Sequence, residues 1–474
     1  QDVNAMLAEE SEKLVREVLA AEIKAYGEND PAVAETLYDL TDVLLAQSRL
    51  EEAEATIRRA LKIELDPADE NRGFLPARLA EVLVAAGRFQ EAEAQLKLAA
   101  GNLAEVLGMD DIAVARVLVD LATVYSRQGR LKDQEQILQQ ALTIAERSAG
   151  ADSVDYAMVQ SELGGLYFFQ SRFAEAEPLL LRAHEALERE LPADDEDLAW
   201  SRYYLGHLRW GQGRYAEADA YYAQAEKVIE DAYGSSHSNV ADIVNCRANV
   251  LYDQGRYAEA EPLYKRAMAI WNGKRGSESA LAMVQTNLGS LYTEVQRYED
   301  AQKLLAAARQ TYERIHGRQH PDYAYAVATD AWLLLAREQY AQAEPLAKQA
   351  LEIYEKTYGP ESSDVAAILV ALAEIQIGQG KDEEGELLLD RAIRIFQRTR
   401  SFPVYQFRAY QDRAELNWKH DRQREAVADL HQAMELAEMQ RSMSTGAERE
   451  RARAFTQYSD VFHQMVAWQA QLGD

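Results

Sequence analysis

The stretch Gln254-Gly255-Arg256-Tyr257-Ala258-Glu259-Ala260-Glu261-Pro262-Leu263-Tyr264 is one copy of a phrase that recurs along the chain, nearly always 42 residues apart. We call the Tyr257 position the anchor. It is filled in turn by Leu50, Phe89, Leu131, Phe173, Tyr215, Tyr257, Tyr298 and Tyr340, with weaker copies at Asp382 and Gln423. Internal repetition at a period of about 20 to 50 residues is typical of solenoids. The chain is therefore expected to offer an extended surface rather than one closed catalytic pocket.

Small residues recur at fixed distances from the anchor and predict the local structure. The position nine residues before the anchor is occupied by Thr41, Ala80, Ala122, Gly164, Gly206, Ala248, Gly289, Ala331, Ala373 and Ala414. Alanine dominates the positions three and ten residues after the anchor. Small side chains let two helices lie close together, and alanine also favours helix. Each unit is thus predicted to be helix–turn–helix, and the chain to be an all-α solenoid of about ten repeats.

Glycine recurs nineteen residues after the anchor, at Gly108, Gly150, Gly234, Gly276, Gly317 and Gly359. Gly27 occupies the same place in an incomplete leading unit. A glycine just past a helix suits a left-handed C-cap, where a side chain would be costly. We therefore expect the second helix of each unit to end there.

This pattern carries a family resemblance. The Leu–small–x–x–Tyr spacing, as in Leu163, Gly164 and Tyr167, followed by the two alanines, resembles the tetratricopeptide repeat. The 42-residue length and the Ala-Glu-Pro-Leu-Tyr phrase look like the kinesin-light-chain subclass. The resemblance implies a right-handed superhelix whose concave wall, made by the first helices, binds peptides or proteins. Kinesin-light-chain grooves hold a peptide with asparagines two residues before the small position, and here only Asn287 matches.

Charge narrows the choice of partners. The chain has 51 Lys and Arg against 79 Asp and Glu, a formal net charge of −28. Such a surface repels nucleic acid and anionic lipid, whereas a basic partner would gain in association rate. The alternative is that acidic charge only keeps a long solenoid in solution. No apolar run is long enough to span a bilayer. We expect a cytoplasmic protein, although an exported one stays open because the chain begins at Gln1.

No sequence motif for catalysis or for a cofactor is present. The chain has no P-loop, HExxH, GxSxG or CxxC pattern, and a single cysteine, Cys246. His316 and His320 lie four residues apart in one inter-repeat turn, where a turn-forming role is favoured over a metal pair. Cys246 has no recognisable partner base, so a packed side chain is favoured over a nucleophile. We therefore expect no enzyme, no cofactor and no metal.

The two ends differ from the repeats. Residues 1–27 fit a lone cap helix with Val15, Leu19 and Ile23 on one face, and the solenoid is expected to continue to residue 440. Residues 441–474 break the period and predict a loop from Arg441 to Gly446 and then a helix. We expect this helix to belong to a truncated unit and to fold back on repeat ten, to be poorly ordered, or to contact another molecule. Residues 438–458 resemble the junction before a CHAT, caspase-like domain in bacterial tetratricopeptide proteins.

The resemblance also places the groove. In a tetratricopeptide unit the concave wall is lined by residues six and three before the small position, and one and four after it. Aromatic and amide side chains gather at these positions in mid-chain, and Trp210→Ala or Asn249→Ala is expected to weaken binding with little loss of stability. The alternative is that the rings fill space between repeats. The candidate partner-binding residues are Phe168, Trp200, Tyr203, His207, Trp210, Asn245, Asn249, Tyr252, Asn287, Tyr325 and Trp332.

Two functions remain open at this stage. The first is a non-enzymatic scaffold that binds a peptide or protein partner in its concave groove. The second is a regulatory arm of a larger CHAT-type protease, with the catalytic domain outside this chain. The full reading frame separates them, because a His/Cys dyad beyond Asp474 supports the second and an early stop codon removes it.

Overall fold

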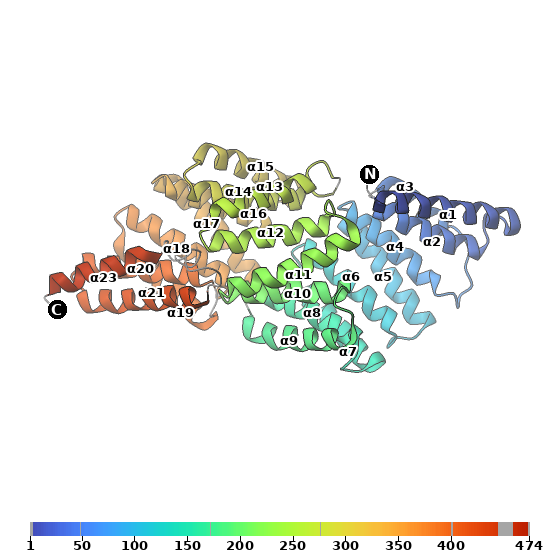
Figure 1. Ribbon diagram of the computed structural model, residues 1–474, viewed down its shortest axis with the longest axis horizontal. Helices are drawn as coiled ribbons and strands as arrows, with labels where there is room; N and C mark the ends of the chain where they lie inside the picture. The colour runs from blue at the N-terminus through green and yellow to red at the C-terminus, as the bar shows by residue number, and fades with distance from the viewer. Residues whose placement is uncertain are drawn as a thin grey trace. The chain divides into compact units, whose positions relative to one another are not determined.

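The computed structural model describes residues 3–47, 49–170, 172–274, 276–399, 402–443 and 458–472. Within these ranges the chain forms 22 helices and no strand, so the all-α prediction is confirmed (Figure 1). In chain order they are α1 (Val3–Tyr26), α2 (Pro31–Ala46), α3 (Leu50–Ala60), α4 (Asn71–Ala85), α5 (Phe89–Val106), α6 (Ile112–Arg127), α7 (Leu131–Ala149), α8 (Val154–Phe169), α9 (Phe173–Glu190), α10 (Glu196–Gly211), α11 (Tyr215–Tyr233), α12 (Ser238–Asp253), α13 (Tyr257–Trp271), α14 (Glu278–Glu294), α15 (Tyr298–His316), α16 (Pro321–Ala336), α17 (Tyr340–Tyr358), α18 (Ser363–Gly378), α19 (Asp382–Thr399), α20 (Pro403–Lys419), α21 (Gln423–Met443) and α23 (Ser459–Leu472).

Local sequence signals set where the helices begin. The second helix of each repeat starts at the anchor, as α13 does at Tyr257. In the first seven repeats the residue before it is an arginine whose guanidinium bonds to an acid three residues on, as Arg256 Nε does to Glu259 Oε1 at 2.9 Å. Five first helices (α2, α6, α10, α12 and α16) start after a side chain that accepts a hydrogen bond from the backbone two residues on, as Asp111 does from Ala113 N at 2.8 Å. The helix–turn–helix prediction is therefore confirmed.

The small position brings the two helices of a repeat into close contact. A Cβ atom built on Gly206 would lie 2.6 Å from the ring of Tyr222, which is fully buried. The same construction on Gly289 meets Leu305 at 2.7 Å. The glycine thus leaves the space that the second helix fills with a large side chain, as expected from the sequence.

Replacing Gly206 by valine is therefore expected to destabilise the protein by about 1 to 3 kcal/mol, because the Tyr222 ring must move in a packed core. Gly101 is the matched control, since it lies inside α5 and a Cβ there meets nothing within 4 Å. Gly101→Ala should instead stabilise by about 1 kcal/mol. Chemical denaturation measures both, and equal stabilities of the two variants would contradict the close contact.

The recurring inter-repeat glycines have positive φ, but not the left-handed helical conformation expected from the sequence. Gly150 has φ 90° and ψ 157°, and Gly317 has φ 79° and ψ 169°. This is an extended region of the backbone map that is open essentially to glycine alone. It turns the chain sharply from one repeat into the N-cap of the next, which explains the glycine while correcting the predicted cap type.

The chain divides into two compact units. Unit 1 comprises residues 1–163, 182–190 and 275–277, and unit 2 comprises residues 164–181, 191–274 and 278–474. In unit 1, successive helix pairs from α2 to α7 share one apolar core. The three residues expected on one face of the first helix pack in this core, Leu19 buried and Val15 and Ile23 against it. In unit 2, the pairs from α10 to α21 stack in the same way.

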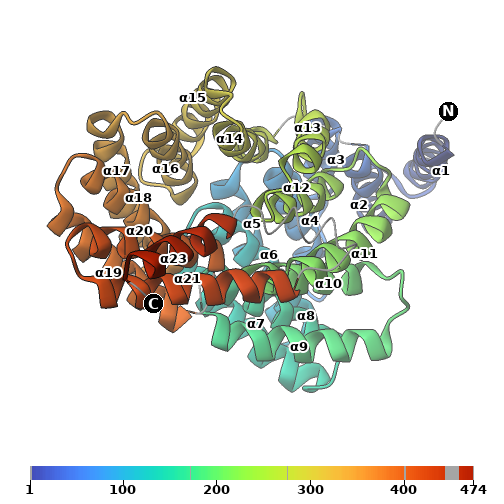
Figure 2. The ribbon, with the colours of Figure 1, turned by 60° about the vertical axis from the view of Figure 1, so that its left-hand side comes forward.

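The C-terminal helix α23 packs on the last repeat of unit 2. Figure 2 shows it beside α20 and α21. The Trp468 ring stacks on Trp418 with 4.3 Å between centroids, and Tyr458 contacts Phe407 at 4.8 Å. Of the three outcomes expected for this segment, the structure shows packing on repeat ten. The predicted start of the loop at Arg441 is wrong, since α21 continues to Met443, and the predicted end of the loop at Gly446 lies outside the described residues.

Candidate functional site

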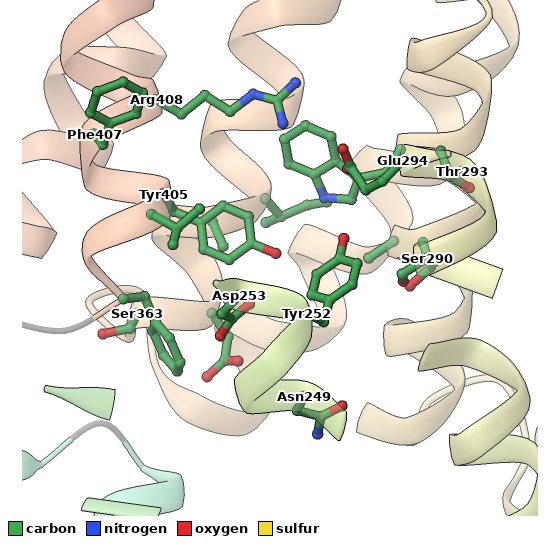
Figure 3. A pocket seen from close by; sticks show the side chains of 18 of the residues that line it. Asn249, Tyr252, Asp253, Ser290, Thr293, Glu294, Ser363, Tyr405, Phe407 and Arg408 are labelled. Atoms are coloured by element: carbon green, nitrogen blue, oxygen red, sulfur yellow. The ribbon is translucent and has the colours of Figure 1, made fainter. Parts of the chain in front are cut away.

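Unit 2 contains a cavity of about 650 Å³ on its first helices. Its lining side chains come mainly from α12, α14, α16, α18 and α20, with Phe402 and Tyr458 from the segments before α20 and α23. Figure 3 shows residues of α12, α14 and α20 pointing towards one space, with the rings of Tyr252 and Tyr405 directed at each other. The volume is in the range of pockets that bind small molecules or peptide side chains.

Aromatic rings form much of the wall. The Trp332 and Tyr405 ring centroids lie 6.2 Å apart. The Arg408 guanidinium stands over the Trp332 ring, with its carbon 4.7 Å from the centroid. Tyr325 is 38% exposed, so its ring is open to a partner. Such rings provide rigid contact area and can stack on flat or cationic groups.

Carboxyl groups form the other part of the wall. Six of the lining side chains are acidic, while Arg408 is the one basic side chain in the described lining; the acids are Asp253, Glu294, Asp364, Glu374, Asp412 and Glu415. Figure 3 shows Asp253 and Glu294 on two different walls, from α12 and α14. The wall of the cavity is therefore rich in carboxyl groups, whose charge depends on their pKa values.

Arg408 is paired with one of these acids. Its Nε lies 2.6 Å from Glu374 Oε1, and its Nη2 donates to Glu374 Oε2 at 3.2 Å. Burial raises the pKa of Glu374, against the opposing charge of Arg408. Burial and the neighbouring charge of Glu374 raise the pKa of Asp412 well above its usual range. The positive charge of Arg408 thus opposes the rise in pKa of both Glu374 and Asp412.

Two further carboxyls of the wall, on Asp253 and Asp364, are partly buried. Burial raises the pKa of Asp253 to about 7, against the hydrogen bond that Trp210 Nε1 donates to its Oδ2 at 2.6 Å. Burial raises the pKa of Asp364 to about 6. Both groups therefore change charge near neutral pH, and a cation placed beside them would favour their ionised forms.

Six of the eleven candidate residues line this cavity: Trp210, Asn249, Tyr252, Asn287, Tyr325 and Trp332. The amides are less free than the sequence suggested. Tyr325 Oη donates to Asn287 Oδ1 at 2.7 Å, and Asn287 Nδ2 donates to Asn245 Oδ1 at 2.8 Å. Asn249 Oδ1 accepts from the buried Tyr264 Oη at 2.7 Å. The amide of Asn287 therefore joins neighbouring repeats, and that of Asn249 joins the two helices of its own repeat.

The other candidates do not line the cavity. Phe168, His207 and Asn245 are buried, and Trp200 and Tyr203 are partly buried against the apolar core. These rings fill space between repeats, which was the alternative interpretation of the pattern. Asn245 is connected to the cavity by the hydrogen bond that it accepts from Asn287, which lines the cavity.

Cys246 has a base nearby that the sequence did not reveal. Its Sγ lies 3.9 Å from His207 Nε2 and 3.7 Å from Tyr203 Oη. Burial raises the pKa of the thiol to about 12 and lowers the pKa of His207 to about 3. Both groups therefore stay neutral, and the pair lacks the thiolate that a cysteine nucleophile needs.

The same positional rule could have found several of the residues missed. Applied to repeats nine and ten, with small residues Ala373 and Ala414, it gives eight positions, of which five line the cavity: Ala367, Glu374, Arg408, Gln411 and Glu415. The candidate residues named from the sequence all lie in repeats four to eight. Asp253 and Glu294 lie five residues after the small position, outside the rule, and only the structure shows them.

Comparison with known proteins gives the same fold. The family model for the tetratricopeptide repeat matches residues 6–64, 75–147, 155–231, 239–294, 280–356 and 331–398. The chain belongs to the tetratricopeptide-repeat family. No curated protein matches it. Among solved structures it is similar to a Rap protein complexed with competence and sporulation factor, with a TM-score of 0.52, 14% identity, and 76% of this chain and 99% of the Rap chain covered. That likeness shows the fold alone.

In the described part of this tetratricopeptide-repeat chain no helix is both long and apolar enough to cross a membrane. One group of metal-ligating residues is found there, namely His316, His320 and Asp322. The two imidazole rings stack with centroids 4.3 Å apart and 18° between planes, so their in-plane lone pairs do not converge on one point.

His320 has a structural task that other repeats share. Its Nδ1 accepts a hydrogen bond from Asp322 N at 3.2 Å and caps α16. His237 caps α12 in the same way, and Asp111 caps α6 with a carboxylate. Burial lowers the pKa of His320 to about 4, which keeps its Nδ1 an acceptor at neutral pH. This geometry supports the turn-forming role over a metal pair.

Proposed function

We propose that this protein is a non-enzymatic scaffold whose tetratricopeptide repeats bind an extended segment of a protein partner at the cavity of unit 2. The observation that carries the proposal is the gathering of partly exposed rings and polar side chains from five successive first helices around one space of about 650 Å³. A segment lying across them would contact each repeat in turn, as extended peptides do on repeat surfaces.

Two further observations support a peptide as the ligand. The similar Rap protein is complexed with competence and sporulation factor. The 42-residue period and Asn287 match the kinesin-light-chain type of repeat, which we propose for this chain. Asn287 lines the cavity, although its Oδ1 already accepts from Tyr325. Shape and aromatic contact are therefore expected to contribute more than amide pairing with a peptide backbone.

Blocking the cavity tests this proposal. Ala367 lies on α18, is partly exposed and lines the cavity, so Ala367→Trp would fill part of it. Peptides are first selected on wild-type protein from an unbiased display library. Their affinity should fall at least about tenfold in Ala367→Trp, equivalent to about 1.4 kcal/mol.

The matched control is Ala306→Trp, because Ala306 is exposed on α15 and does not line the cavity. That variant should bind the selected peptides as the wild type does. Selected peptides that bind Ala367→Trp with unchanged affinity would place the site elsewhere. A library that yields no binder at all would remove the proposal.

A second candidate function is a regulatory arm of a CHAT-type protease. It rests on the run from Glu438 to Tyr458, of which residues 444–457 lie outside the described part. On α23, Val466 is 67% exposed, which leaves an apolar side chain that a following helix could cover. Sequencing the reading frame beyond Asp474 decides it: a His/Cys dyad supports this candidate and an early stop codon excludes it.

A further inference from the structure

The start of α20 brings repeat ten back against repeats that are far away in the sequence. Phe402 N donates a hydrogen bond to the backbone oxygen of Gly211, the last residue of α10, at 3.2 Å. The Phe402 ring centroid lies 6.1 Å from that of Trp210 and 6.4 Å from that of Phe173. Val404 packs against the apolar core that is formed mainly by repeats five to seven. Repeat ten therefore contacts repeats four and five as well as its neighbour, repeat nine.

A turn glycine shows how closely the repeats approach each other here. Gly213 and Gly380 occupy the same place in the turns of repeats five and nine, with φ of 74° and 78°. Gly380 is exposed, and a Cβ atom there would meet nothing within 4 Å. Gly213 is buried, and a Cβ atom there would lie 2.7 Å from Pro403 Cγ and would also clash with Gln440 Nε2. Repeat ten thus covers a turn that is open in repeat nine.

The contact of repeat ten with repeat five forms part of the wall of the cavity. Phe402 and Trp210 line the cavity together with side chains from the first helices of repeats six to ten. The wall therefore runs from α10 through the first helices of the intervening repeats to α20, where it meets α10 again. A partner segment that has a folded domain at each end cannot be threaded through a closed wall. Such a segment needs an opening.

The contact at Phe402 is the place where the wall can open with the smallest loss of packing. Neighbouring repeats share large apolar cores, whereas the contact between α10 and α20 is much smaller than those between neighbouring repeats. The backbone of Phe402 is also left-handed, with φ 48° and ψ 62°, which is uncommon for an aromatic residue. Such a conformation persists only while surrounding contacts hold it, so it favours opening.

We propose that this contact is a clasp, which closes repeats five to ten around the cavity and opens to admit a partner segment that lies inside a longer chain. The clasp is the contact of Phe402 and Pro403 with Trp210, Gly211 and Gly213. This inference rests on the proposed function and specifies how the ligand enters. The closed clasp excludes such a segment, and opening releases the left-handed backbone of Phe402.

The test measures how fast one display-selected peptide associates in two forms. In the free form its ends are open, and in the flanked form a small folded domain is fused to each end. Wild-type protein should bind the flanked form at least about tenfold more slowly than the free form, because binding waits for the clasp to open. Phe402→Gly removes the ring and suits a left-handed backbone, so it should bind the flanked form at least about tenfold faster than wild-type protein does. The rate is measured rather than the affinity because Phe402 also lines the cavity.

Gly213→Ala opens the clasp without changing a residue that lines the cavity. Its Cβ atom displaces Pro403, so this variant should also bind the flanked form faster than wild-type protein does. Gly380→Ala is the matched control, because it places alanine at a similar positive φ where nothing lies within 4 Å. Asp421→Gly is the control for Phe402→Gly, since Asp421 has φ 58° and follows the other end of α20. Both controls should bind the flanked form at the wild-type rate.

Thermal melting checks that the four variants are folded. Equal association rates of the free and flanked forms with wild-type protein would overturn the clasp. A flanked-form rate that neither Phe402→Gly nor Gly213→Ala raises, or that the controls raise equally, would overturn it as well. The proposed function would stand in each of these cases, because Ala367→Trp tests it separately with the free peptide.

Discussion

Replacing Arg408 by methionine is expected to lower the free energy of unfolding by about 3 to 5 kcal/mol at about pH 8, because it leaves Glu374 and Asp412 buried without their cation. The loss should be much smaller at about pH 5. Burial raises the pKa of both carboxyls in the folded state, so their contribution to stability is present at low pH and falls as pH rises through these values. Without Arg408 the pKa values of Glu374 and Asp412 rise further. In acid, a proton on each carboxyl then removes the negative charge that Arg408 had balanced. Glu294 on α14 faces the same guanidinium and adds to the effect.

The control is Arg422→Met, which removes a pair of similar geometry on the surface. Arg422 Nη1 and Nη2 lie 2.7 and 2.8 Å from the Glu386 oxygens. Its loss should cost less than about 1 kcal/mol at either pH. Denaturant titrations of both variants at the two pH values measure the difference. Equal losses for Arg408→Met and Arg422→Met would show that the buried acids are not held as described.

The second large effect concerns Asp253 and Asp364. Their pKa values of about 7 and about 6 lie above the unfolded value of about 4. The native state therefore binds more protons, and the stability that these groups contribute below about pH 4 is lost as pH rises through about 6 to 7. The variant Asp253→Asn/Asp364→Asn should thus gain stability over the wild type between about pH 5 and pH 8, on the order of 2 to 4 kcal/mol since both carboxyls keep some contact with water.

The difference between variant and wild type is the quantity to measure, rather than either curve alone. Burial lowers the pKa of His207 to about 3 and of His320 to about 4, so these histidines stabilise the folded state as pH rises and oppose the carboxyls. Both histidines are retained in the variant, so their effect cancels in the difference. A difference that stays constant with pH would contradict the raised pKa values of Asp253 and Asp364.

The sequence predicted the fold because one period set every helix pair. The small residue Gly206 leaves the space that the ring of Tyr222 fills, and the anchor Tyr257 begins the second helix of its repeat. The structure confirms both predictions. The glycine turns were predicted by position but not by conformation, since φ and ψ of Gly317 depend on the path into the next N-cap.

The candidate site was predicted in part, for a physical reason. The positions one and four residues after the small residue face the cavity at Asn249 and Tyr252. The positional rule does not state which side chains at such positions are instead packed in the apolar core. Trp210 shows the difference. Its Nε1 donates to Asp253 and its ring lies 6.1 Å from Phe402, so Trp210→Ala is now expected to lower stability as well as binding. Contacts with Phe402 join repeats far apart in sequence, and no local pattern encodes them.

The most direct measurement of the central claim is the affinity of display-selected peptides for wild-type protein, Ala367→Trp and Ala306→Trp, determined side by side by calorimetry. Filling the cavity at Ala367 should weaken binding at least about tenfold. The same change at the exposed Ala306 should leave the affinity unchanged. Equal affinity for all three proteins would contradict the account that the cavity of unit 2 is the binding site.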